Sequence, residues 1–338
     1  SSGERQTGHR LTFVAELVDD GGRAASGPDF FRSAEFLEAE GTTHSLLVHE
    51  TSGLTEMVAS APLVVREIPG TDRLDATSPY GYPGMAISDG PRLRLAFPID
   101  PGSIDFTPTG LVSIFLRHSL EGGPPVTGLP PLAGATPRNV CLLSDPSLPR
   151  KSRASDRQQI RKNLKRGCSV EITPGPETTP AQRAGFFAAY TETMRRTRAA
   201  GRYFFSEAYF ELILSAEGTW LFILRAPGGE AAAASIAALS DGLLHYYLSG
   251  TADAHLKGAP MKNVVEAMID FGAERELAVN FGGGLAPGDA LEEFKRGFAN
   301  LEEQWFTSEI VCDEEASEEL AARLGDSRVP GFFPPYRA

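Results

Sequence analysis

The chain has 338 residues, of which 41% are hydrophobic and 22% are charged, so it suits one large globular domain or two of ordinary size. Its formal net charge of −12 argues against a protein that coats nucleic acids or membranes, although a local basic site stays possible. No apolar run approaches the roughly 20 residues that a membrane-spanning helix needs, and no signal peptide opens the sequence. We therefore expect a cytoplasmic protein without membrane insertion.

Cysteine and histidine spacing gives no sign of a metal site. The three cysteines, Cys141, Cys168 and Cys312, are scattered and form no CxxC pair, which fits a reducing compartment and excludes a cysteine-based zinc site. The six histidines show no HExxH or comparable spacing. We expect no bound metal and no tightly bound cofactor.

Two long segments of the sequence resemble each other, the first beginning at Phe30 and the second at Phe204. Each predicts an amphipathic helix, then Glu-Gly-Thr, a short apolar strand, a glycine-containing turn and a strand of small residues. Glu40-Gly41-Thr42 corresponds to Glu217-Gly218-Thr219. So long an offset indicates a duplicated domain rather than a solenoid of short repeats; the alternative is two ordinary helix–hairpin units.

The division between the two domains is predicted near residue 138. The stretch EGGPPVTGLPPLAGATP (121–137) is too rich in proline and glycine for regular structure, and NVCLLSD (139–145) then predicts a strand. We expect domains at 1–138 and 139–338. Both are expected to be α/β, with a mixed sheet and helices on its faces.

The segment SDRQQIRKNLKRG predicts a basic helix that starts with a capping box at Ser155 and ends at Gly167. Arg157, Arg161 and Lys165 recur every fourth residue and so share one face. One interpretation is a solvated face that balances acidic neighbours. The other is a docking surface for the phosphates of a nucleotide, of coenzyme A or of tRNA.

The second half places an aromatic strand, LLHYYLSGT (243–251), before a helix (261–274) and a strand that ends in three glycines (277–284). A strand, a glycine turn and a helix N-terminus together make a generic anion site. The sequence has neither GxxxxGK[ST] nor GxGxxG at this place, so the glycines are not a nucleotide-binding loop.

The last helix of the second half carries a lone lysine, Lys295. Asp289 can cap this helix, and Lys295 is predicted at the edge of its apolar stripe. The predicted stripe consists of Leu291, Phe294, Phe298 and Leu301. The alternative to a functional role is a structural one, in which the aliphatic part of Lys295 packs along the apolar stripe and its ammonium group reaches solvent.

Five motifs in order resemble the GNAT acyltransferase fold in the tandem version of the FemABX family, the aminoacyl-tRNA-dependent transferases that build peptidoglycan bridges. They are SPYGYPGM (78–85), LVSIFLRHSL (111–120), IRKNLKRG (160–167), TMRRTRAAGRYFFSEAYF (193–210) and DALEEFKRGF (289–298). The resemblance implies two tandem GNAT-like domains, the first on the acceptor side and the second on the donor side.

The resemblance also implies roles for particular residues. Lys295 matches the family's functional lysine, and Phe294 is expected to line the same site. Gly282 and Gly283 allow a close approach of backbone to substrate. The candidates for the acceptor side are Tyr80, Tyr82, Arg117, Arg202 and Tyr203, and Tyr247 is a further candidate for substrate binding. Arg157, Arg161 and Lys165 are the candidates for binding tRNA phosphates.

The donor implied by the resemblance is an aminoacyl-tRNA. Acetyl-CoA GNATs carry [QR]xxGx[GA] before a helix, where backbone N–H groups grip the pyrophosphate, whereas this sequence has HLKGAP (255–260). Proline has no N–H to donate, so the departure weakens the acetyl-CoA alternative.

The expected reaction is amide formation between the amino acid of a charged tRNA and a small amine or peptide acceptor, such as a natural product or a cell-wall precursor. No DNA partner is expected, and nothing requires more than a monomer. The alternatives are an acyl-CoA N-acyltransferase on the same fold and a non-catalytic binding module. No side-chain base stands out, because Asp289 suits a helix cap and His245 suits a satisfied core position.

Overall fold

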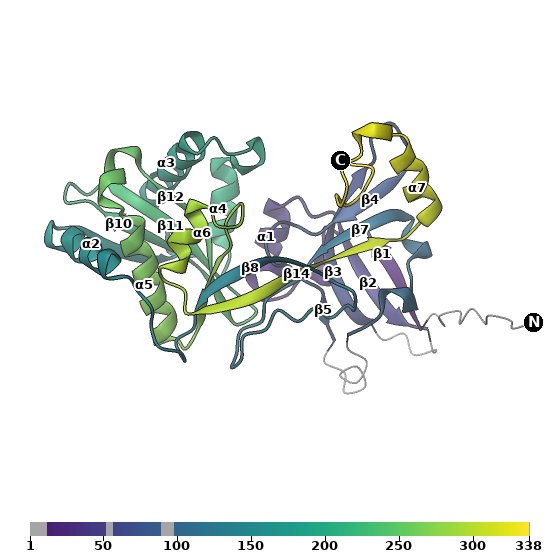
Figure 1. The fold of residues 1–338 in the computed structure, drawn as a ribbon, viewed down its shortest axis with the longest axis horizontal. Coiled ribbons are helices and arrows are strands. Elements are labelled where there is room, and N and C mark those ends of the chain that lie inside the picture. Colours follow the sequence, from purple (N-terminus) through teal and green to yellow (C-terminus); the bar gives the residue numbers. More distant parts are fainter. Residues whose placement is uncertain (1–11, 52–56, 89–97, 338) are drawn as a thin grey trace, which may run out of the picture.

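A computed structural model describes residues 12–51, 57–88 and 98–337. The chain folds into two halves, each a sheet with helices packed against it, and one 14-stranded mixed sheet runs through both (Figure 1). The fold class is therefore the α/β class with a mixed sheet that the sequence predicts. Among the described residues, no helix is both long and apolar enough to cross a membrane.

The first half is built on strands in the order β6–β1–β2–β3–β4–β7, with the short β5 beside β3. The strands are β1 (Phe13–Val18), β2 (His44–Glu50), β3 (Met57–Glu67), β4 (Leu74–Thr77), β5 (Ala86–Ile87), β6 (Ile104–Asp105) and β7 (Leu111–Arg117). Helix α1 (Ala34–Ala39) precedes β2. No named element lies between β7 and β8, as the proline-rich and glycine-rich sequence predicts.

The second half has strands in the order β8–β13–β12–β11–β10–β9. They are β8 (Thr136–Ser144), β9 (Ser169–Pro174), β10 (Thr219–Arg225), β11 (Ala231–Ser240), β12 (Leu243–Thr251) and β13 (Ala278–Gly282). Its helices are α2 (Ala154–Lys165), α3 (Pro180–Arg196), α4 (Glu207–Ser215), α5 (Met261–Glu274) and α6 (Ala290–Arg296).

The two halves repeat the same strand pairing. In the first half β1–β2, β2–β3 and β3–β4 are antiparallel and β4–β7 is parallel. In the second half β9–β10, β10–β11 and β11–β12 are antiparallel and β12–β13 is parallel. Gly41 and Gly218 occupy equivalent turns with left-handed φ of 67° and 74°. The tandem arrangement predicted from the Glu-Gly-Thr repeat is confirmed, although the glycine turn of the first copy lies mostly outside the described residues.

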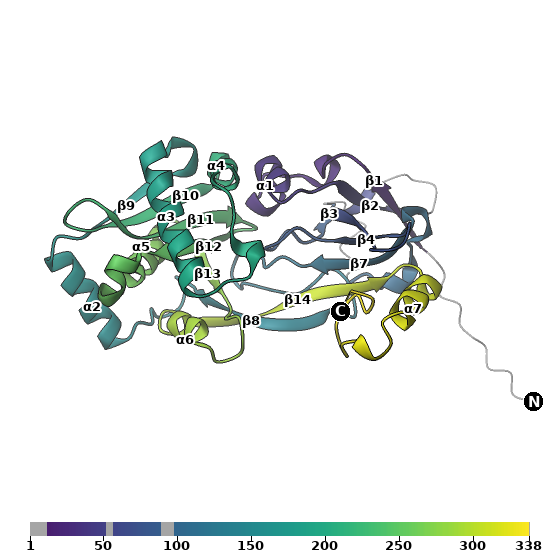
Figure 2. The ribbon, with the colours of Figure 1, turned by 90° about the horizontal axis from the view of Figure 1, so that it is seen from above.

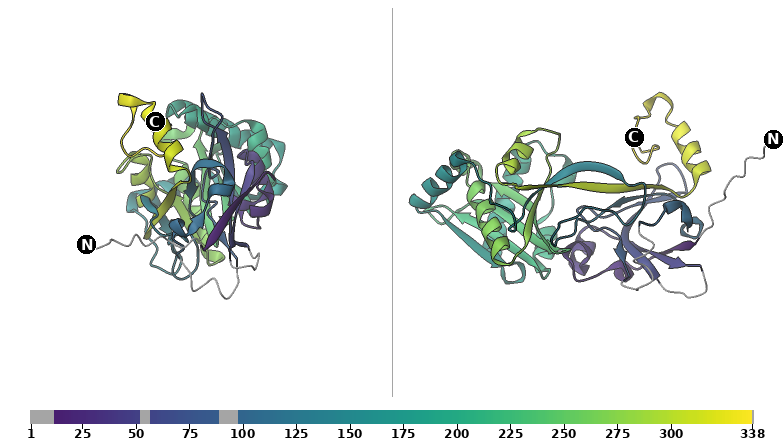
Figure 3. Two further views of the ribbon diagram at one scale, coloured as in Figure 1. Left: turned by 90° about the vertical axis from the view of Figure 1, so that its right-hand side faces the viewer. Right: turned by 60° about the horizontal axis from the view of Figure 1, so that its bottom comes forward.

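Strand β14 (Leu301–Val311) joins the halves. Its first part pairs with β8 and its last part, from Thr307, pairs with β7. Figure 3 shows β8 and β14 as a long ribbon pair that spans both halves. Helix α7 (Glu314–Ala322) follows, and Tyr336 Oη lies 2.6 Å from Ser113 Oγ in β7. The end of the chain thus returns to the first half; the domain division at residue 138 stays a prediction.

The local predictions are accurate in the second half, with two corrections. Strand β12 and helix α5 have the predicted bounds. The predicted capping box at Ser155 is wrong, because the N-cap of α2 lies two residues earlier, at Arg153, and has no side-chain cap. The predicted apolar stripe of the last helix is correct for Phe294 and Phe298, which pack in one core cluster. It is wrong for Leu291, which is 40% exposed, and for Leu301, which belongs to β14 because α6 ends at Arg296.

The contact between the halves, here called the seam, is held by a buried ion pair. Arg32 Nη2 lies 2.7 Å from Asp241 Oδ1 in the β11–β12 turn and 3.1 Å from Asp29 Oδ2. Gly122 N donates to Asp241 O at 2.7 Å, and a Cβ on Gly122 would lie 2.1 Å from Gly242 O. The β11–β12 turn of the second half therefore packs directly against the backbone of the first half.

Removal of Arg32 should destabilise the protein strongly. Arg32→Ala leaves Asp241 buried without its cation, and breaking a buried pair costs about 3–5 kcal/mol. The control is Arg323→Ala, whose ion pair with Glu319 is exposed on α7 and should contribute below about 1 kcal/mol. The measurement is the thermal unfolding midpoint; equal shifts for both variants would contradict a structural role for the seam pair.

Candidate functional site

Lys295 lies inside the molecule on α6. The helix starts at Asp289, whose Oδ1 accepts a hydrogen bond from Glu292 N at 2.8 Å, so the predicted cap is confirmed. Lys295 is only 7% exposed, and its Nζ donates to Gly283 O at 2.6 Å. Burial lowers the pKa of Lys295 to about 8, against the opposing influence of Cys141 and Asp289.

Bare backbone faces this lysine at the end of β13. Gly282 has a left-handed φ of 69°, and its N–H donates to Asn280 Oδ1 at 2.9 Å. A Cβ on Gly282 would lie 3.8 Å from Lys295 Nζ and 3.4 Å from Tyr82 Oη. The glycine therefore keeps side-chain atoms out of the space between the ammonium and the phenol.

Tyr82 brings the first half to this place. Its Oη lies 3.6 Å from Cys141 Sγ on β8, and its ring packs 5.7 Å from the ring of Trp305 on β14. Burial raises the pKa of Tyr82, so the group stays a neutral phenol. The structure thus collects Tyr82, Gly282, Gly283 and Lys295, four of the predicted site residues. The sequence did not identify Cys141 and Trp305, because neither lies in a recognisable motif.

His245 is a satisfied core residue beneath Tyr82. It is 2% exposed and stacks on the Tyr82 ring at 5.2 Å. Nε2 lies 3.3 Å from Ser240 O and Nδ1 lies 3.2 Å from Asn280 Nδ2, so Nε2 carries the proton in a neutral ring. Burial lowers the pKa of His245 to about 4. The histidine fixes Asn280 and Tyr82 in place.

A second group of predicted residues surrounds Arg117 at the end of β7. Its guanidinium lies 4.8 Å from the centre of the Tyr80 ring and 4.7 Å from that of Trp305. The Tyr80 ring contacts that of Tyr203 at 6.3 Å, and Arg202 Nη2 donates to Tyr203 Oη at 3.1 Å. Since Trp305 contacts both Arg117 and Tyr82, this group adjoins the one around Lys295.

Tyr247 projects from a bulge in β12. The register shifts between Ile236 and Ala237 of β11, which leaves Tyr247 without a paired residue. Its Oη lies 2.8 Å from Tyr209 Oη on α4, and its ring packs 5.7 Å from Phe31. Tyr247 therefore lies on the second-half side of the seam.

Phe294 and the basic helix lie apart from the seam. The Phe294 ring packs 5.6 Å from Phe298, with its side chain against the core between β13 and α5. On α2, Arg157, Arg161 and Lys165 are exposed and form no salt bridge with any described residue. The start of α2 adjoins α6, because Arg153 Nη2 donates to Glu293 O at 3.1 Å.

Helix α2 also covers the start of α5. In acetyl-CoA GNATs the [QR]xxGx[GA] motif before the corresponding helix grips the pyrophosphate. Asn163 Nδ2 donates to Gly258 O and to Asn263 Oδ1, both at 2.8 Å. Lys262 Nζ pairs with Asp156 Oδ1 at 2.8 Å, and Pro260 at the N-cap of α5 is buried. Protein groups thus occupy much of this helix end.

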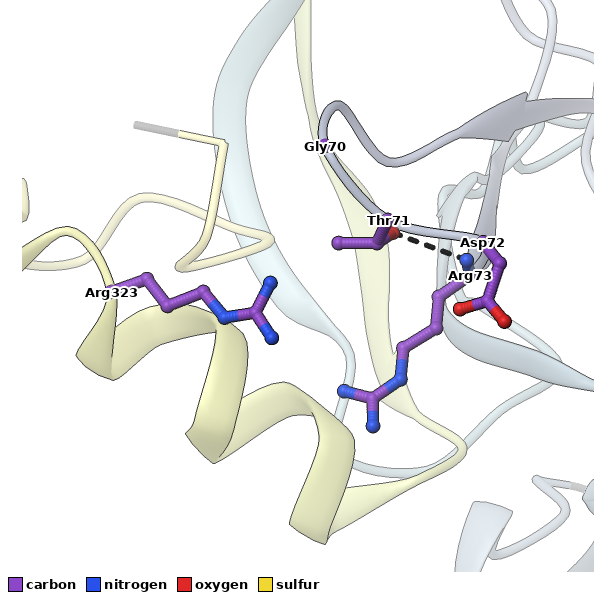
Figure 4. A pocket seen from close by; sticks show the side chains of 5 residues that line it. All are labelled: Gly70, Thr71, Asp72, Arg73 and Arg323. Carbon is purple, nitrogen blue, oxygen red and sulfur yellow. Dashed lines mark hydrogen bonds between the residues drawn. The ribbon is translucent and has the colours of Figure 1, made fainter.

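A hollow of about 610 Å³ lies in the first half, beside the β3–β4 turn and the end of α7. Figure 4 shows the Arg73 and Arg323 side chains pointing into it from opposite sides. Glu319 pairs with Arg73 at 2.9 Å and with Arg323 at 2.8 Å. Asp72 also lines the hollow, so together with Glu319 two carboxylates balance the two arginines there. None of the predicted site residues lines it.

Comparisons with known proteins agree with this arrangement. Residues 150–296 match the family model of the acetyltransferase (GNAT) domain. The structure is similar to that of FemX, with a TM-score of 0.58 and 11% sequence identity over 90% of this chain and 99% of FemX. No curated protein matches the chain.

Two lysylphosphatidylglycerol synthetase structures are also similar. The C-terminal domain of a putative lysylphosphatidylglycerol synthetase from Agrobacterium fabrum gives a TM-score of 0.53 and 13% identity, covering 90% of this chain and 95% of that one. L-PGS from Bacillus licheniformis gives 0.51 and 12%, covering 85% and 90%.

The protein therefore has the GNAT acyltransferase fold, in the tandem form in which two such units share one sheet. Within that class its fold is FemX-like, as the five sequence motifs predict.

The three cysteines should differ in reactivity. Burial raises the pKa of the Cys141 thiol to about 11 and that of Cys312 to about 12, so both hold very little thiolate at pH 8. Cys168 is partly exposed at the end of α2. Peptide mapping after brief treatment with iodoacetamide should find Cys168 alkylated first. Equally fast labelling of Cys141 would contradict its enclosure beside Tyr82.

Proposed function

We propose that the protein is an aminoacyltransferase that moves an amino acid from aminoacyl-tRNA to the amine of a small acceptor and so forms an amide bond. The observation that carries the proposal is the buried Lys295, held at Gly283 O with Tyr82 of the other half beside Gly282. A cation enclosed between two halves of a FemX-like fold suits an ester carbonyl that develops negative charge.

The chemistry requires little from the protein beyond position and charge. The acceptor amine attacks the ester carbonyl, the C–O bond to the tRNA ribose breaks, and the proton of the amine ends on the leaving ribose oxygen. Lys295 would stabilise the oxyanion of the tetrahedral intermediate, while the two halves hold amine and ester together. The partners of His245 and Asp289 favour neither of them as a general base.

Two observations favour tRNA over coenzyme A as the donor. The start of α5 is covered by Asn163 and capped by Pro260, which has no N–H to offer a pyrophosphate. The exposed face of α2 carries Arg157, Arg161 and Lys165 without salt-bridge partners among the described residues. The match to the acetyltransferase (GNAT) model keeps an acyl-CoA donor as the second candidate.

The test is reconstitution with mixed radiolabelled aminoacyl-tRNAs and a panel of amines and short peptides, with and without prior RNase treatment. The proposal expects an amide product that RNase abolishes. Product formed from acetyl-CoA and insensitive to RNase would establish the second candidate instead.

Lys295→Ala should lower the rate of transfer by about 10² or more, because it removes a charge that meets the transition state. The matched control is Arg296→Ala on the same helix, whose side chain pairs with Glu292 and points elsewhere. The measurement is single-turnover transfer from labelled aminoacyl-tRNA. An unchanged rate for Lys295→Ala would show that the lysine has only a structural role.

The pH profile should report Lys295 directly. Its pKa of about 8 leaves the ammonium charged below that pH and neutral above it, so transfer should decline as pH rises through about 8. Lys295→Arg keeps its charge throughout, and the decline should vanish in this variant even if the rate is lower. A decline with the same midpoint in both proteins would assign it to another group.

The basic face of α2 should determine the salt dependence of tRNA binding. Arg157→Ala with Arg161→Ala removes two phosphate contacts, so the slope of log K against log salt should flatten by about 1.5–2. The control, Arg323→Ala with Arg328→Ala, removes two exposed charges from the opposite end of the molecule. Equal slopes for the two double variants in filter binding would show that α2 is only a solvated face.

A further inference from the structure

A carboxylate of the first half reaches into the second half at the seam. Glu40 ends helix α1, and its Oε1 accepts a hydrogen bond from Tyr209 Oη on α4 at 2.6 Å. Because the Tyr209 hydroxyl donates to Glu40, it accepts in turn from Tyr247 Oη, 2.8 Å away. Figure 2 shows α1 and α4 side by side where the halves meet.

Local structure does not account for this placement. A negative charge at the C-terminal end of a helix is unfavourable, because the last carbonyl groups carry partial negative charge. The repeat provides a comparison: Glu217 follows α4 in the same Glu-Gly-Thr turn, with the same left-handed glycine, yet its side chain is exposed. The turn itself therefore does not require an enclosed carboxylate at Glu40.

The charge of Glu40 is not neutralised by contact. No described residue forms a salt bridge with it, and the hydrogen bond that its carboxylate accepts comes from the Tyr209 phenol, a neutral donor. Burial raises the pKa of Glu40, opposed by Tyr209, by Tyr80 and by the more distant Arg117. A carboxylate accepts about four hydrogen bonds, so capacity remains for a cationic donor.

Arg117 presents the opposite charge to the same seam. Its Nε donates to Gly81 O at 2.9 Å and its plane is held between Tyr80 and Trp305. No described residue accepts a hydrogen bond from its Nη atoms. No hydrogen bond or ion pair joins Arg117 to Glu40 in the described part of the chain, so neither group uses up the hydrogen-bonding capacity of the other.

We infer that Glu40 and Arg117 bind the two ends of a zwitterionic acceptor: Glu40, fixed by Tyr209 and Tyr247, takes the ammonium, and Arg117 takes a carboxylate or phosphate. The Tyr80 and Trp305 rings supply flat aromatic surface beside the Arg117 guanidinium, and the Tyr82 ring packs on Trp305. The inference rests on the proposed function in assigning this ligand as the acceptor, and it narrows the acceptor class to small molecules that carry both charges.

Trp305 provides a binding signal that needs neither tRNA nor turnover. The chain has two tryptophans, so Trp220→Phe leaves Trp305 as the sole reporter. The probes are the dipeptide Ala-Phe, its N-acetyl and C-amide forms, and phosphoethanolamine. Ala-Phe or phosphoethanolamine should change Trp305 fluorescence saturably below about 10 mM. Blocking the charged end at Glu40 or Arg117 should weaken binding by about tenfold or more.

Glu40→Gln separates ammonium binding from a structural role, because the amide oxygen still accepts from Tyr209. In this variant Ala-Phe and N-acetyl-Ala-Phe should bind equally weakly, whereas Glu217→Gln should behave as the parent. The inference is overturned if neither zwitterion binds, if the parent does not distinguish the N-acetyl form, or if Glu40→Gln weakens both peptides by the same factor. Saturable, charge-dependent binding by a protein that transfers nothing from tRNA would refute the proposed function and leave the site intact.

Discussion

The buried pairing of Arg32 with Asp241 is the constraint from which the site follows. Each half could form its own sheet, but a seam of fixed geometry needs contacts that tolerate little displacement. The ion pair, with Asp29 on its other side and Gly122 against Gly242, provides them. Charges that are 10% and 12% exposed are costly to separate, so the β11–β12 turn has one stable position against the first half.

That position brings together groups that neither half contains alone. Tyr82 of the first half meets Gly282 and Lys295 of the second, and Glu40 meets Tyr209. Strand β14 reinforces the arrangement, because it pairs with β8 and β7 and so carries Trp305 to the seam. The duplication therefore gives two similar folds whose facing surfaces have different chemistry: a lysine with open backbone on one side, a carboxylate and an arginine on the other.

Much of this organisation can be predicted from the sequence. Periodicity and end signals gave helix α5 and strand β12 without error, and the Glu-Gly-Thr repeat gave the tandem arrangement. The burial of Lys295 could not be predicted from its position on a helix, because it depends on α6 stopping after two turns and on Gly283 O as a partner. Ser155 is not the N-cap of α2 because the helix begins earlier, at a place where the Arg153 side chain bonds to α6. This tertiary contact is not visible in the local sequence.

Residues whose role depends on the seam were beyond sequence reasoning. Cys141 and Trp305 lie in ordinary strand patterns far apart in the chain, and the motif at 193–210, which contains Tyr209, does not show that this tyrosine meets the first half. The repeat marks Glu40, but its copy Glu217 has the same Glu-Gly-Thr sequence and is exposed, whereas Glu40 is half-buried. Only the packing of one half on the other distinguishes them.

The central claim is that Lys295 meets the acyl group of an aminoacylated tRNA end at the seam. The most direct measurement is a crystal structure with a stable amide analogue of the 3′-aminoacyl-adenosine terminus. The claim predicts the carbonyl oxygen of the analogue within hydrogen-bonding distance of Lys295 Nζ, with its aminoacyl group beside Gly282 and Tyr82. An analogue bound at the start of α5, or with Lys295 still closed on Gly283 O and out of reach, would contradict it.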